Sequence, residues 1–542
     1  MMKKFFIRIN GSVLFLLIAL SLFSCGNNGN KKGEADTSYL EEISVAQLGK
    51  DYREGKTTIK KVVTDYLSRI DKIDKKGPML NSVIAINPDA IKIAEELDKE
   101  MAEGKIRGPL HGIPVILKDN IDTKDSMPTT AGAVVLKNSF VGKDSRVAEL
   151  LREAGAVIIA KSNMSEWANF RANLSSSGWS GISGQTKNPY VTDRNPCGSS
   201  SGSGVAVSAN LCAFAIGTET NGSIVCPSNN NGIVGLKPTV GLISRTGIIP
   251  ISFTQDTPGP MGRTVEDVAV ALGVLAGADS TDSKTLAKEA KFYNDYTQFL
   301  KKDGLKGKRI GLVTNISGFH FKVDSLMKDA VAFLKSSGAE VVEVNMPMKG
   351  EVSGASFQVL LYEFKDGLNN YFASLGDKAP VKNIEELIEF NKKDSVELRF
   401  FDQQLLEMAQ KKEGLDDPKY KQALALMQKG TREEGIDKVM NSNKLDALIA
   451  PTGGPAWKTD LVNGDNFLGS SSSFAAISGY PNITVPMGFI SDLPVGISFF
   501  GRAWSEPVLL EIAYAFEQGT KHRKAPKYLN YVMLKSKKEK HK

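Results

Sequence analysis

Hydrophobic residues recur at helical spacing in two segments near the start of the chain. One segment runs from Ser44 to about Lys75, and the other runs from Pro88 to Gly104. Apolar positions three and four residues apart form one face of an amphipathic helix, and Ser44 and Asn87 stand where N-caps are expected. The pattern therefore predicts two surface helices.

Two short apolar runs have the composition of buried strands. Val115-Ile116-Leu117 follows a loop rich in glycine and proline and ends at Lys118, and Ala156–Ala160 follows a helical segment that ends near Gly155. Strands that alternate with helices are typical of a sheet covered by helices on both faces. The predicted fold class is therefore α/β, with helices on both faces of a central sheet (α/β/α).

The amino-acid composition changes twice in the second half of the chain. Residues 285–440 are rich in charged and helix-forming residues, which predicts a helical insertion with amphipathic helices such as Asp324–Ser336 and Val396–Lys411. Strand-like runs return at Ala447–Ala450 and Ile483–Val485. No internal repeat is evident, and the pattern places no firm domain boundary anywhere after the first 24 residues.

A stretch rich in serine, glycine, asparagine and proline runs from Asn173 to Gly204. This composition alone is typical of a linker. Apolar segments follow it at Val205–Ile216 and Ile233–Leu236, however, and others precede it. We therefore expect a loop held between buried elements.

The first residues have the pattern of an export signal. Lys3, Lys4 and Arg8 precede an apolar stretch, Val13–Leu20, that is too short to span a bilayer comfortably. Leu22-Phe23-Ser24-Cys25 then resembles the lipobox of bacterial lipoproteins, in which the cysteine is lipidated and becomes the first mature residue. An ordinary signal peptide and a membrane anchor are the alternatives.

These features predict an exported lipoprotein of the bacterial cell envelope, held on a periplasmic or surface membrane face by acyl chains on Cys25. The expected segments are a signal peptide at 1–24, a flexible tether at 25–37, a main domain at 38–530 that includes the 285–440 insertion, and a basic tail at 531–542.

Composition places this chain of 542 residues among globular proteins, because 41% of the residues are hydrophobic. The net charge of +7 includes three basic residues of the leader, which leaves +4 for the rest of the chain. We therefore expect no nucleic-acid partner. The sequence makes no prediction about the oligomeric state.

Three cysteines, Cys197, Cys212 and Cys226, lie near the serine-rich stretch. Their odd number and their spacing indicate neither a disulfide framework nor a metal site. We interpret them as small buried hydrophobic residues.

The small number of histidines limits the chemistry. The chain has only His111, His320, His522 and His541, and the last two lie in or beside a lysine-rich end. A serine nucleophile then needs another base. Lys118, at the end of an apolar strand, is a candidate because desolvation lowers a lysine pKa toward about 7 to 8. In the alternative interpretation Lys118 stays protonated as a partner of Asp119 or Asp122.

Two motifs supply candidate serines. Ser199 lies in the glycine-rich stretch Gly198–Gly204, and Ser223 lies in a later Gly-Ser pair. Because a lysine base must sit close to the proton that it accepts, Ser199 could relay the proton of Ser223 to Lys118. The backbone N–H groups of Thr220, Asn221, Gly222 and Ser223 could then stabilise an oxyanion, unless this segment is an ordinary turn.

These motifs carry a resemblance to a known family. Gly198–Gly204, Gly217–Ile224 and Gly232–Thr239 resemble the signature of the amidase signature family, and Gly112–Asn120 is similar to the lysine motif of that family. The resemblance extends over residues 44–504. It implies the amidase signature fold, in which helices cover both faces of a mixed central β-sheet.

The resemblance also implies roles. Lys118 corresponds to the base, Ser199 to a bridging serine in a cis peptide, and Ser223 to the nucleophile. It implies an acyl-enzyme formed from an amide with release of ammonia or an amine, followed by hydrolysis, with no metal and no organic cofactor.

A narrower similarity points to bacterial peptide amidases, which remove the C-terminal amide from peptides. It rests on Trp167–Arg171, Ser175–Ser180, Gly241–Pro260 and Tyr362–Asn369. Many family members have glycine where this chain has Asn221, which leaves substrate preference open at that position. Further candidates for substrate contacts are Asn120, Asn163, Arg171 and Ser200; the first three could instead fill turns.

Other functions fit parts of the sequence. Gly198–Gly202 matches the nucleophile elbow of α/β-hydrolases, with Ser200 as nucleophile, but a poor strand precedes it. Ser325-Leu326-Met327-Lys328 matches S-x-x-K at the start of an expected surface helix. The remaining alternatives are the glutaminase subunit of a tRNA-dependent amidotransferase and a non-catalytic surface lipoprotein that binds peptides or amides.

Overall fold

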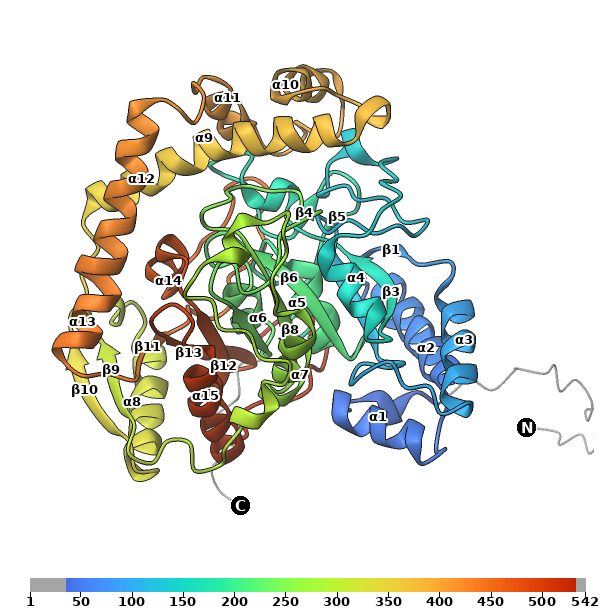
Figure 1. Ribbon diagram of the computed structural model, residues 1–542, viewed down its shortest axis with the longest axis horizontal. Helices are drawn as coiled ribbons and strands as arrows, with labels where there is room; N and C mark the ends of the chain where they lie inside the picture. The colour runs from blue at the N-terminus through green and yellow to red at the C-terminus, as the bar shows by residue number, and fades with distance from the viewer. Residues whose placement is uncertain (1–35, 533–542) are drawn as a thin grey trace, which may run out of the picture. The chain divides into compact units, whose positions relative to one another are not determined.

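The computed structural model describes residues 36–532 (Figure 1). Cys25 and the expected signal peptide lie outside the described residues, as do most of the expected tether and basic tail. Residues from Leu40 onward form one compact unit. Among the described residues, no helix combines the length and the apolar character that crossing a bilayer requires.

A large mixed β-sheet forms the centre of this unit. Its eleven strands lie in the order β1-β3-β2-β6-β8-β7-β12-β13-β11-β9-β10, and a separate hairpin pairs β4 with β5. The strands are β1 (Val83–Ile86), β2 (Pro114–Lys118), β3 (Val157–Ser162), β4 (Trp179–Ser180), β5 (Gly184–Gln185), β6 (Phe214–Glu219), β7 (Val234–Lys237), β8 (Thr257–Gly262), β9 (Arg309–Val313), β10 (Glu340–Val344), β11 (Ala447–Pro451), β12 (Asn482–Ile490) and β13 (Leu493–Phe500).

The directions of the strands divide the sheet into three parts. Strands β3, β2 and β6 are parallel to one another, as are β11, β9 and β10. Between these two groups β8, β7, β12 and β13 pair antiparallel with their neighbours. The remaining strand, β1, pairs antiparallel with β3 at the edge of the sheet. The mixed sheet that the resemblance implied is confirmed.

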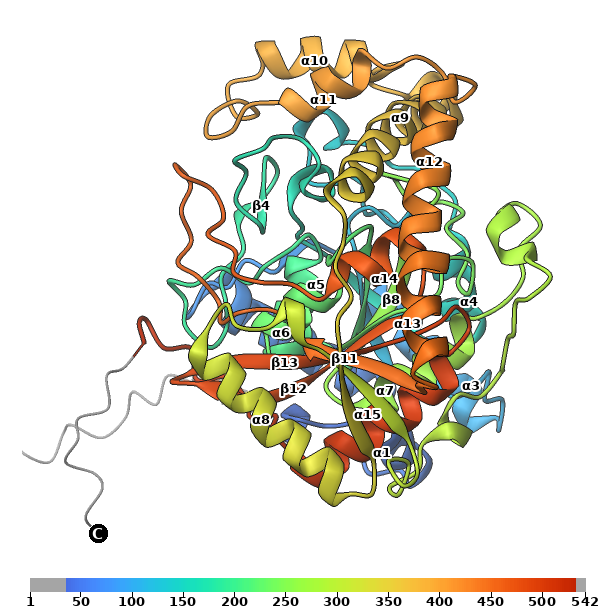
Figure 2. The same cartoon turned by 90° about the vertical axis from the view of Figure 1, so that its left-hand side faces the viewer.

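Helices cover both faces of the sheet. Figure 2 shows α5 and α6 on one side of β12 and β13, and α8 and α15 on the other. The helices are α1 (Val45–Arg53), α2 (Ile59–Arg69), α3 (Ala90–Ala102), α4 (Arg146–Glu153), α5 (Ser201–Ser208), α6 (Val225–Asn230), α7 (Val265–Leu275), α8 (Phe321–Ser336), α9 (Gly350–Ser374), α10 (Ile384–Lys393), α11 (Gln404–Gln410), α12 (Pro418–Thr431), α13 (Asp437–Ser442), α14 (Ser472–Ser478) and α15 (Glu506–Thr520).

The first expected helix is two helices. Ser44 caps α1, as expected, by accepting a hydrogen bond from Gln47 N. Gly55, with a φ of +66°, then interrupts the helical path, and Thr58 caps α2 through Lys61 N. The prediction of a second N-cap was wrong, because Asn87 Oδ1 accepts from Asp89 N and α3 begins only at Ala90.

The segment 285–440 holds α8–α12, and it also supplies β9 and β10 to the edge of the main sheet. The helix expected from Val396 to Lys411 is confirmed only in part, as α11. Glu397 is buried beside Arg171, and Phe401 packs edge-on against Trp179. Phe400, the preceding residue, packs edge-on against the same Trp179 ring. Because successive side chains point in different directions on a helix, these contacts override the local helical pattern.

The sheet brings the candidate catalytic segments together. Lys118 ends β2, and β2 pairs in parallel with β6, which ends at Glu219. The carboxyl ends of parallel neighbours meet at the same edge of a sheet, where α/β proteins commonly form their sites. The loop before α5 and the turn between β6 and α6 reach this edge.

Candidate active site

Lys118 lies fully buried at the end of β2. Its Nζ contacts three oxygens: Ser199 Oγ at 2.7 Å, Thr218 O at 3.1 Å and Thr218 Oγ1 at 2.9 Å. Burial lowers the pKa of Lys118 to about 7, although the nearby Asp256 and Glu219 carboxylates act to raise it. A substantial fraction of this amine is therefore uncharged near neutral pH.

The alternative partners of Lys118 lie elsewhere. Asp119 and Asp122 interact with a second buried lysine, Lys161, which binds Ile121 O and Thr129 Oγ1. Among the described residues no ion pair joins Lys118 to either carboxylate. The interpretation of Lys118 as a permanently protonated partner of these aspartates is therefore wrong.

The contacts of Lys118 orient its lone pair. Thr218 O is only an acceptor, and Thr218 Oγ1 also accepts a hydrogen bond from Asn120 Nδ2 at 3.1 Å. An uncharged amine has two N–H groups and one lone pair. If the two N–H groups bind the two Thr218 oxygens, the lone pair is left for the Ser199 hydroxyl.

Ser199 follows a cis peptide bond, Gly198–Ser199, as the resemblance implied. Its side chain is fully buried, and its carbonyl oxygen accepts from Ser165 N at 3.1 Å. The next residue, Ser200, donates from its backbone N to Ser223 O at 3.2 Å. This bond joins the segment of Ser199 directly to that of Ser223.

Ser223 occupies a tight turn between β6 and α6. Gly222 has a φ of +86°, which favours glycine. Glu219 Oε2 accepts from Ile224 N at 2.8 Å and Val225 N at 3.1 Å, and Asp256 Oδ1 accepts from Thr220 Oγ1 at 2.6 Å. Two carboxylates thus fix both ends of the predicted oxyanion segment.

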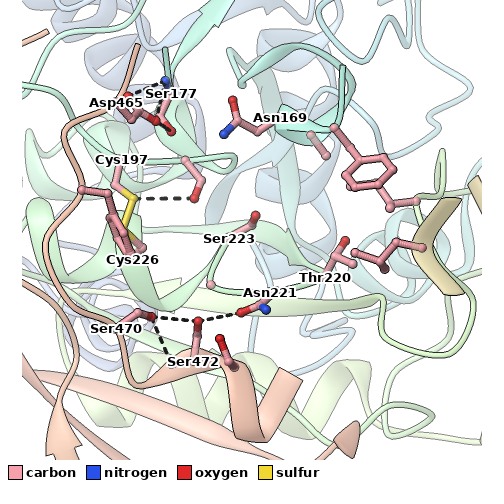
Figure 3. Close-up of a pocket in the computed structure, with 18 of the residues that line it drawn as sticks. Asn169, Ser177, Cys197, Thr220, Asn221, Ser223, Cys226, Asp465, Ser470 and Ser472 are labelled. Atoms are coloured by element: carbon pink, nitrogen blue, oxygen red, sulfur yellow. Dashed lines mark hydrogen bonds between the residues drawn. A yellow bond between two sulfur atoms is a disulfide. The ribbon is translucent and has the colours of Figure 1, made fainter. Parts of the chain in front are cut away.

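A cavity of about 430 Å³ opens beside Ser223. Figure 3 shows the Ser223 side chain directed into it, with Asn169 and Asn221 on either side in this view. Thr220 and Gly222 line the same cavity, as expected for an oxyanion segment. The apolar part of its wall includes Phe170, Ile251, Leu360, Trp457 and Phe467.

The sequence indicated no disulfide framework, and this interpretation was wrong for two of the three cysteines. Cys197 and Cys226 form a disulfide that lines the cavity, whereas Cys212 is free and buried as expected. The turn before Gly198 and the first turn of α6 bring the two cysteines together, which their spacing in the sequence does not reveal. Among the described residues, no group of three or more His, Cys, Asp or Glu side chains could hold a metal ion.

Three of the four candidate substrate contacts lie behind the cavity wall. Asn120 binds Thr218. Asn163 is fully buried and binds the 184–186 hairpin, and Ser200 Oγ bonds to the backbone of Thr218. None of the three is among the residues that line the cavity, and each donates or accepts hydrogen bonds with neighbouring residues instead.

Arg171 also has a structural environment. It is 1% exposed and forms ion pairs with Glu166 and Glu397. Burial raises the pKa of Glu166, although the Arg171 charge acts to lower it. This cluster supports the loop that carries Asn169.

The alternative nucleophile and the S-x-x-K motif do not reach the site. The hydroxyl of Ser200 is occupied by Thr218. Ser325 and Lys328 are exposed on α8. His111 is a buried side chain whose ring contacts Leu97 O at 3.1 Å.

Sequence reasoning missed Asp465, Asn169 and Thr218. Asp465 comes from a loop far along the chain and faces the cavity, where it binds Ser177 and Trp457. Thr218 stands inside the recognised motif, but only the three-dimensional contact with Lys118 gives it a role. Thr218 and Asn169 are polar residues within motifs that resemble those of the family, and this was the only sequence feature that could have identified them.

Comparisons with known proteins identify the family of this chain. The profile of the Amidase family matches residues 61–510. The native peptide amidase from Stenotrophomonas maltophilia has 48% sequence identity and a TM-score of 0.86, over 90% of this chain and 99% of that one.

Two relatives are similar in sequence over most of their length. A protein of Arabidopsis thaliana named a probable amidase is 40% identical over 539 residues, which are 97% of this chain and 99% of the relative. One subunit of the glutamyl-tRNA(Gln) amidotransferase from Carboxydothermus hydrogenoformans is 33% identical over 84% of this chain and 93% of the relative.

The fold and the family define a hydrolase that acts on amide C–N bonds. The chain belongs to the Amidase family and has the amidase signature fold. In its motifs it is similar to the bacterial peptide amidases, as the sequence indicated.

Proposed function

We propose that this amidase is an exported enzyme that removes the C-terminal amide from peptides or cleaves related amides. Ser223 is the nucleophile, Ser199 the relay and Lys118 the base. The observation that carries the proposal is the 2.7 Å contact between Lys118 Nζ and Ser199 Oγ, beside a cavity that Ser223 lines.

In the proposed reaction Ser223 Oγ attacks the amide carbonyl carbon. Its proton passes to Ser199 Oγ as the Ser199 proton passes to the lone pair of Lys118. The oxyanion that forms faces the backbone N–H groups of residues 220–223. The C–N bond then breaks, the leaving nitrogen takes the proton back from Lys118 through Ser199, and water hydrolyses the Ser223 ester by the same relay.

The charge of the cavity favours neutral acyl groups over free glutamine. Free glutamine carries an α-ammonium and an α-carboxylate, and a bound charge needs a partner of opposite charge. Asp465 is the only charged side chain among the described residues that line the cavity. Its oxygens already accept hydrogen bonds from Ser177, Asn195 and Trp457. A glutaminase subunit is therefore the weaker alternative.

Export is supported by the Cys197–Cys226 disulfide. Disulfides persist in oxidising compartments outside the cytoplasm, whereas the tRNA-dependent amidotransferases work in the cytoplasm. Together with the lipobox-like Leu22–Cys25, the disulfide supports a lipoprotein whose membrane partner is reached through acyl chains on Cys25.

Ammonia release from peptide amides, short aliphatic amides and aryl amides tests the proposed activity. We expect Ser223→Ala and Lys118→Ala each to lower kcat by at least about 1,000-fold, with unchanged circular dichroism, because each variant lacks a group that forms or deprotonates the nucleophile. Ser199→Ala should be severely impaired and folded.

Ser325→Ala is the matched control, since it removes the exposed serine of the S-x-x-K motif and should leave turnover unchanged. Wild-type rates in Lys118→Ala would contradict the lysine base. A protein that binds peptide amides without releasing ammonia, and whose affinity Ser223→Ala leaves unaltered, would instead be the non-catalytic binding protein.

A further inference from the structure

The cavity contains a side-chain amide that the proposed reaction does not use. Asn169 is half-buried, lines the cavity and points into the space that Ser223 also faces (Figure 3). Its Oδ1 accepts a hydrogen bond from Ser175 Oγ at 3.0 Å. Among the described residues no acceptor for Asn169 Nδ2 is found. The amide therefore presents N–H donors to the cavity.

The backbone that carries Asn169 is unusual. Trp167, Ala168 and Asn169 have φ values of 48°, 54° and 71°, three successive residues in the left-handed region. A non-glycine residue adopts this conformation at a cost, so the surroundings must enforce it. Trp167 N donates to Ala131 O at 2.9 Å, and Trp167 packs edge-on against Phe372.

The buried charges on either side of this turn fix it further. Glu166 immediately precedes Trp167, and its Oε2 accepts from Gly181 N at 2.9 Å. Arg171 follows two residues after Asn169 and binds Glu166 and Glu397. These contacts hold both ends of the turn, so the position of Asn169 is set before a substrate arrives.

The surroundings of Asn169 define what it can bind. A donor that loses water without gaining an acceptor weakens binding, so an occupant of this part of the cavity needs a polar acceptor. Asp465, also in the cavity wall, is already bonded to Ser177, Asn195 and Trp457. Phe170, Leu360 and other apolar residues form the remaining wall, which suits a neutral, partly apolar acyl group.

We infer that Asn169 is a specificity-determining residue that donates a hydrogen bond to a backbone carbonyl oxygen of the substrate, one peptide unit before the amide that is cleaved. The inference rests on the proposed function and deepens it. It assigns the substrate class as amides whose acyl part carries a second amide carbonyl, such as N-acylated amino acid amides and peptide amides, in preference to simple aliphatic amides.

Two substrates that differ in one group test this inference. N-acetylphenylalaninamide and 3-phenylpropanamide share the benzyl group and the primary amide, and only the first has the additional acetamido carbonyl. For Asn169→Leu, which is similar in size but has no donor, we expect KM for N-acetylphenylalaninamide to rise about 10-fold or more. The kcat for this substrate and both constants for 3-phenylpropanamide should stay within about twofold of wild type.

Two further variants support the test. Asn169→Asp replaces the donor by an acceptor. It should also lose the preference for N-acetylphenylalaninamide over 3-phenylpropanamide. Asn370→Ala, which alters an exposed asparagine on α9 that bonds only to Asp366 among the described residues, is the control and should change neither substrate. Circular dichroism and the melting temperature verify that each variant is folded.

The outcomes separate the two claims. If wild type releases ammonia from neither substrate nor from longer peptide amides, the proposed function is wrong. If wild type is active and Asn169→Leu leaves the ratio of the two kcat/KM values unchanged, by affecting both substrates equally or neither, the role of Asn169 is wrong and the proposed function stands.

Discussion

The amine of Lys118 has an environment that changes its acid–base behaviour. A lysine in water is protonated at neutral pH, whereas this one is fully buried against Ser199 and Thr218. Desolvation opposes the charged form, and Thr218 supplies acceptors for both N–H groups of the uncharged form. Asn120 holds Thr218 Oγ1 in place, so it would act on the proposed base, Lys118, through Thr218.

The pH dependence of catalysis follows from this environment. Only uncharged Lys118 can accept a proton, and its pKa is lowered to about 7. We therefore expect kcat/KM to rise with pH through an apparent pKa near 7, and to be about 100-fold lower at pH 5 than on the plateau. Rates for a peptide amide between pH 5 and 9 measure this profile. A profile that is flat below pH 8, or that falls as pH rises, would contradict the assignment of Lys118.

The sequence identified candidate site residues within the recognised motifs and few outside them. Lys118, Ser199 and Ser223 were selected because their residue types and motif positions are distinctive. Asn169 was not selected, since its place in the cavity depends on three left-handed residues and on the Arg171 cluster. Such long-range contacts leave no periodic pattern in the sequence.

At the scale of elements, the disulfide joins the two segments that carry the candidate serines. Cys197 lies directly before the Gly198–Ser199 peptide, and Cys226 lies in the first turn of α6, shortly after Ser223. The bond closes a loop with a sequence separation of 29 residues. A cross-link of this size restricts the unfolded chain and stabilises the native state.

Removing the disulfide should therefore affect stability. We expect the double variant Cys197→Ser/Cys226→Ser to lose about 3 kcal/mol in the free energy of unfolding, measured by urea denaturation, and to lose activity because its two serine segments are less well positioned. Dithiothreitol should reproduce both losses in wild type and have no further effect on the double variant, which is the control. Equal stability of the reduced and oxidised wild-type protein would refute this role.

The local sequence pattern also does not predict one central strand, β8. β8 contains Pro258, Gly259 and Pro260, residues that weaken strand formation, and it still pairs with β6 and β7 inside the sheet. A Cβ at Gly259 would lie 2.1 Å from Leu236 O. Close packing of neighbouring strands selects glycine there, so the strand is visible only once the sheet is assembled.

For the whole molecule, the hydrophobic pattern predicted the α/β class and the family resemblance implied the mixed sheet, while the strand order could not be predicted. The apolar runs of β2, β3 and β11 are readable because these strands are buried along their whole length. β9 and β10 were hidden in a segment dominated by helical residues. Their place at the sheet edge depends on pairing across long sequence distances, which no local window contains.

The predicted location of the enzyme at a membrane depends on Cys25, which lies outside the described residues. Cys25 stands after an apolar stretch and ahead of the compact unit that begins at Leu40. Burial of acyl chains contributes about 0.8 kcal/mol per methylene, so two or three chains on Cys25 would hold the protein on a membrane. We expect the full-length chain, expressed in a bacterial host, to incorporate labelled palmitate and to sediment with membranes together with amidase activity.

Cys25→Ser should abolish the label and move the activity to the soluble fraction, since it removes the acceptor for the lipid and leaves the active site intact. Ser223→Ala is the reciprocal control: it should remain labelled and membrane-bound without activity. If wild type carries no label and still sediments with membranes, the apolar stretch Val13–Leu20 rather than a lipid holds the protein there, and the lipoprotein assignment is wrong. If wild type is unlabelled and soluble, both forms of attachment are excluded.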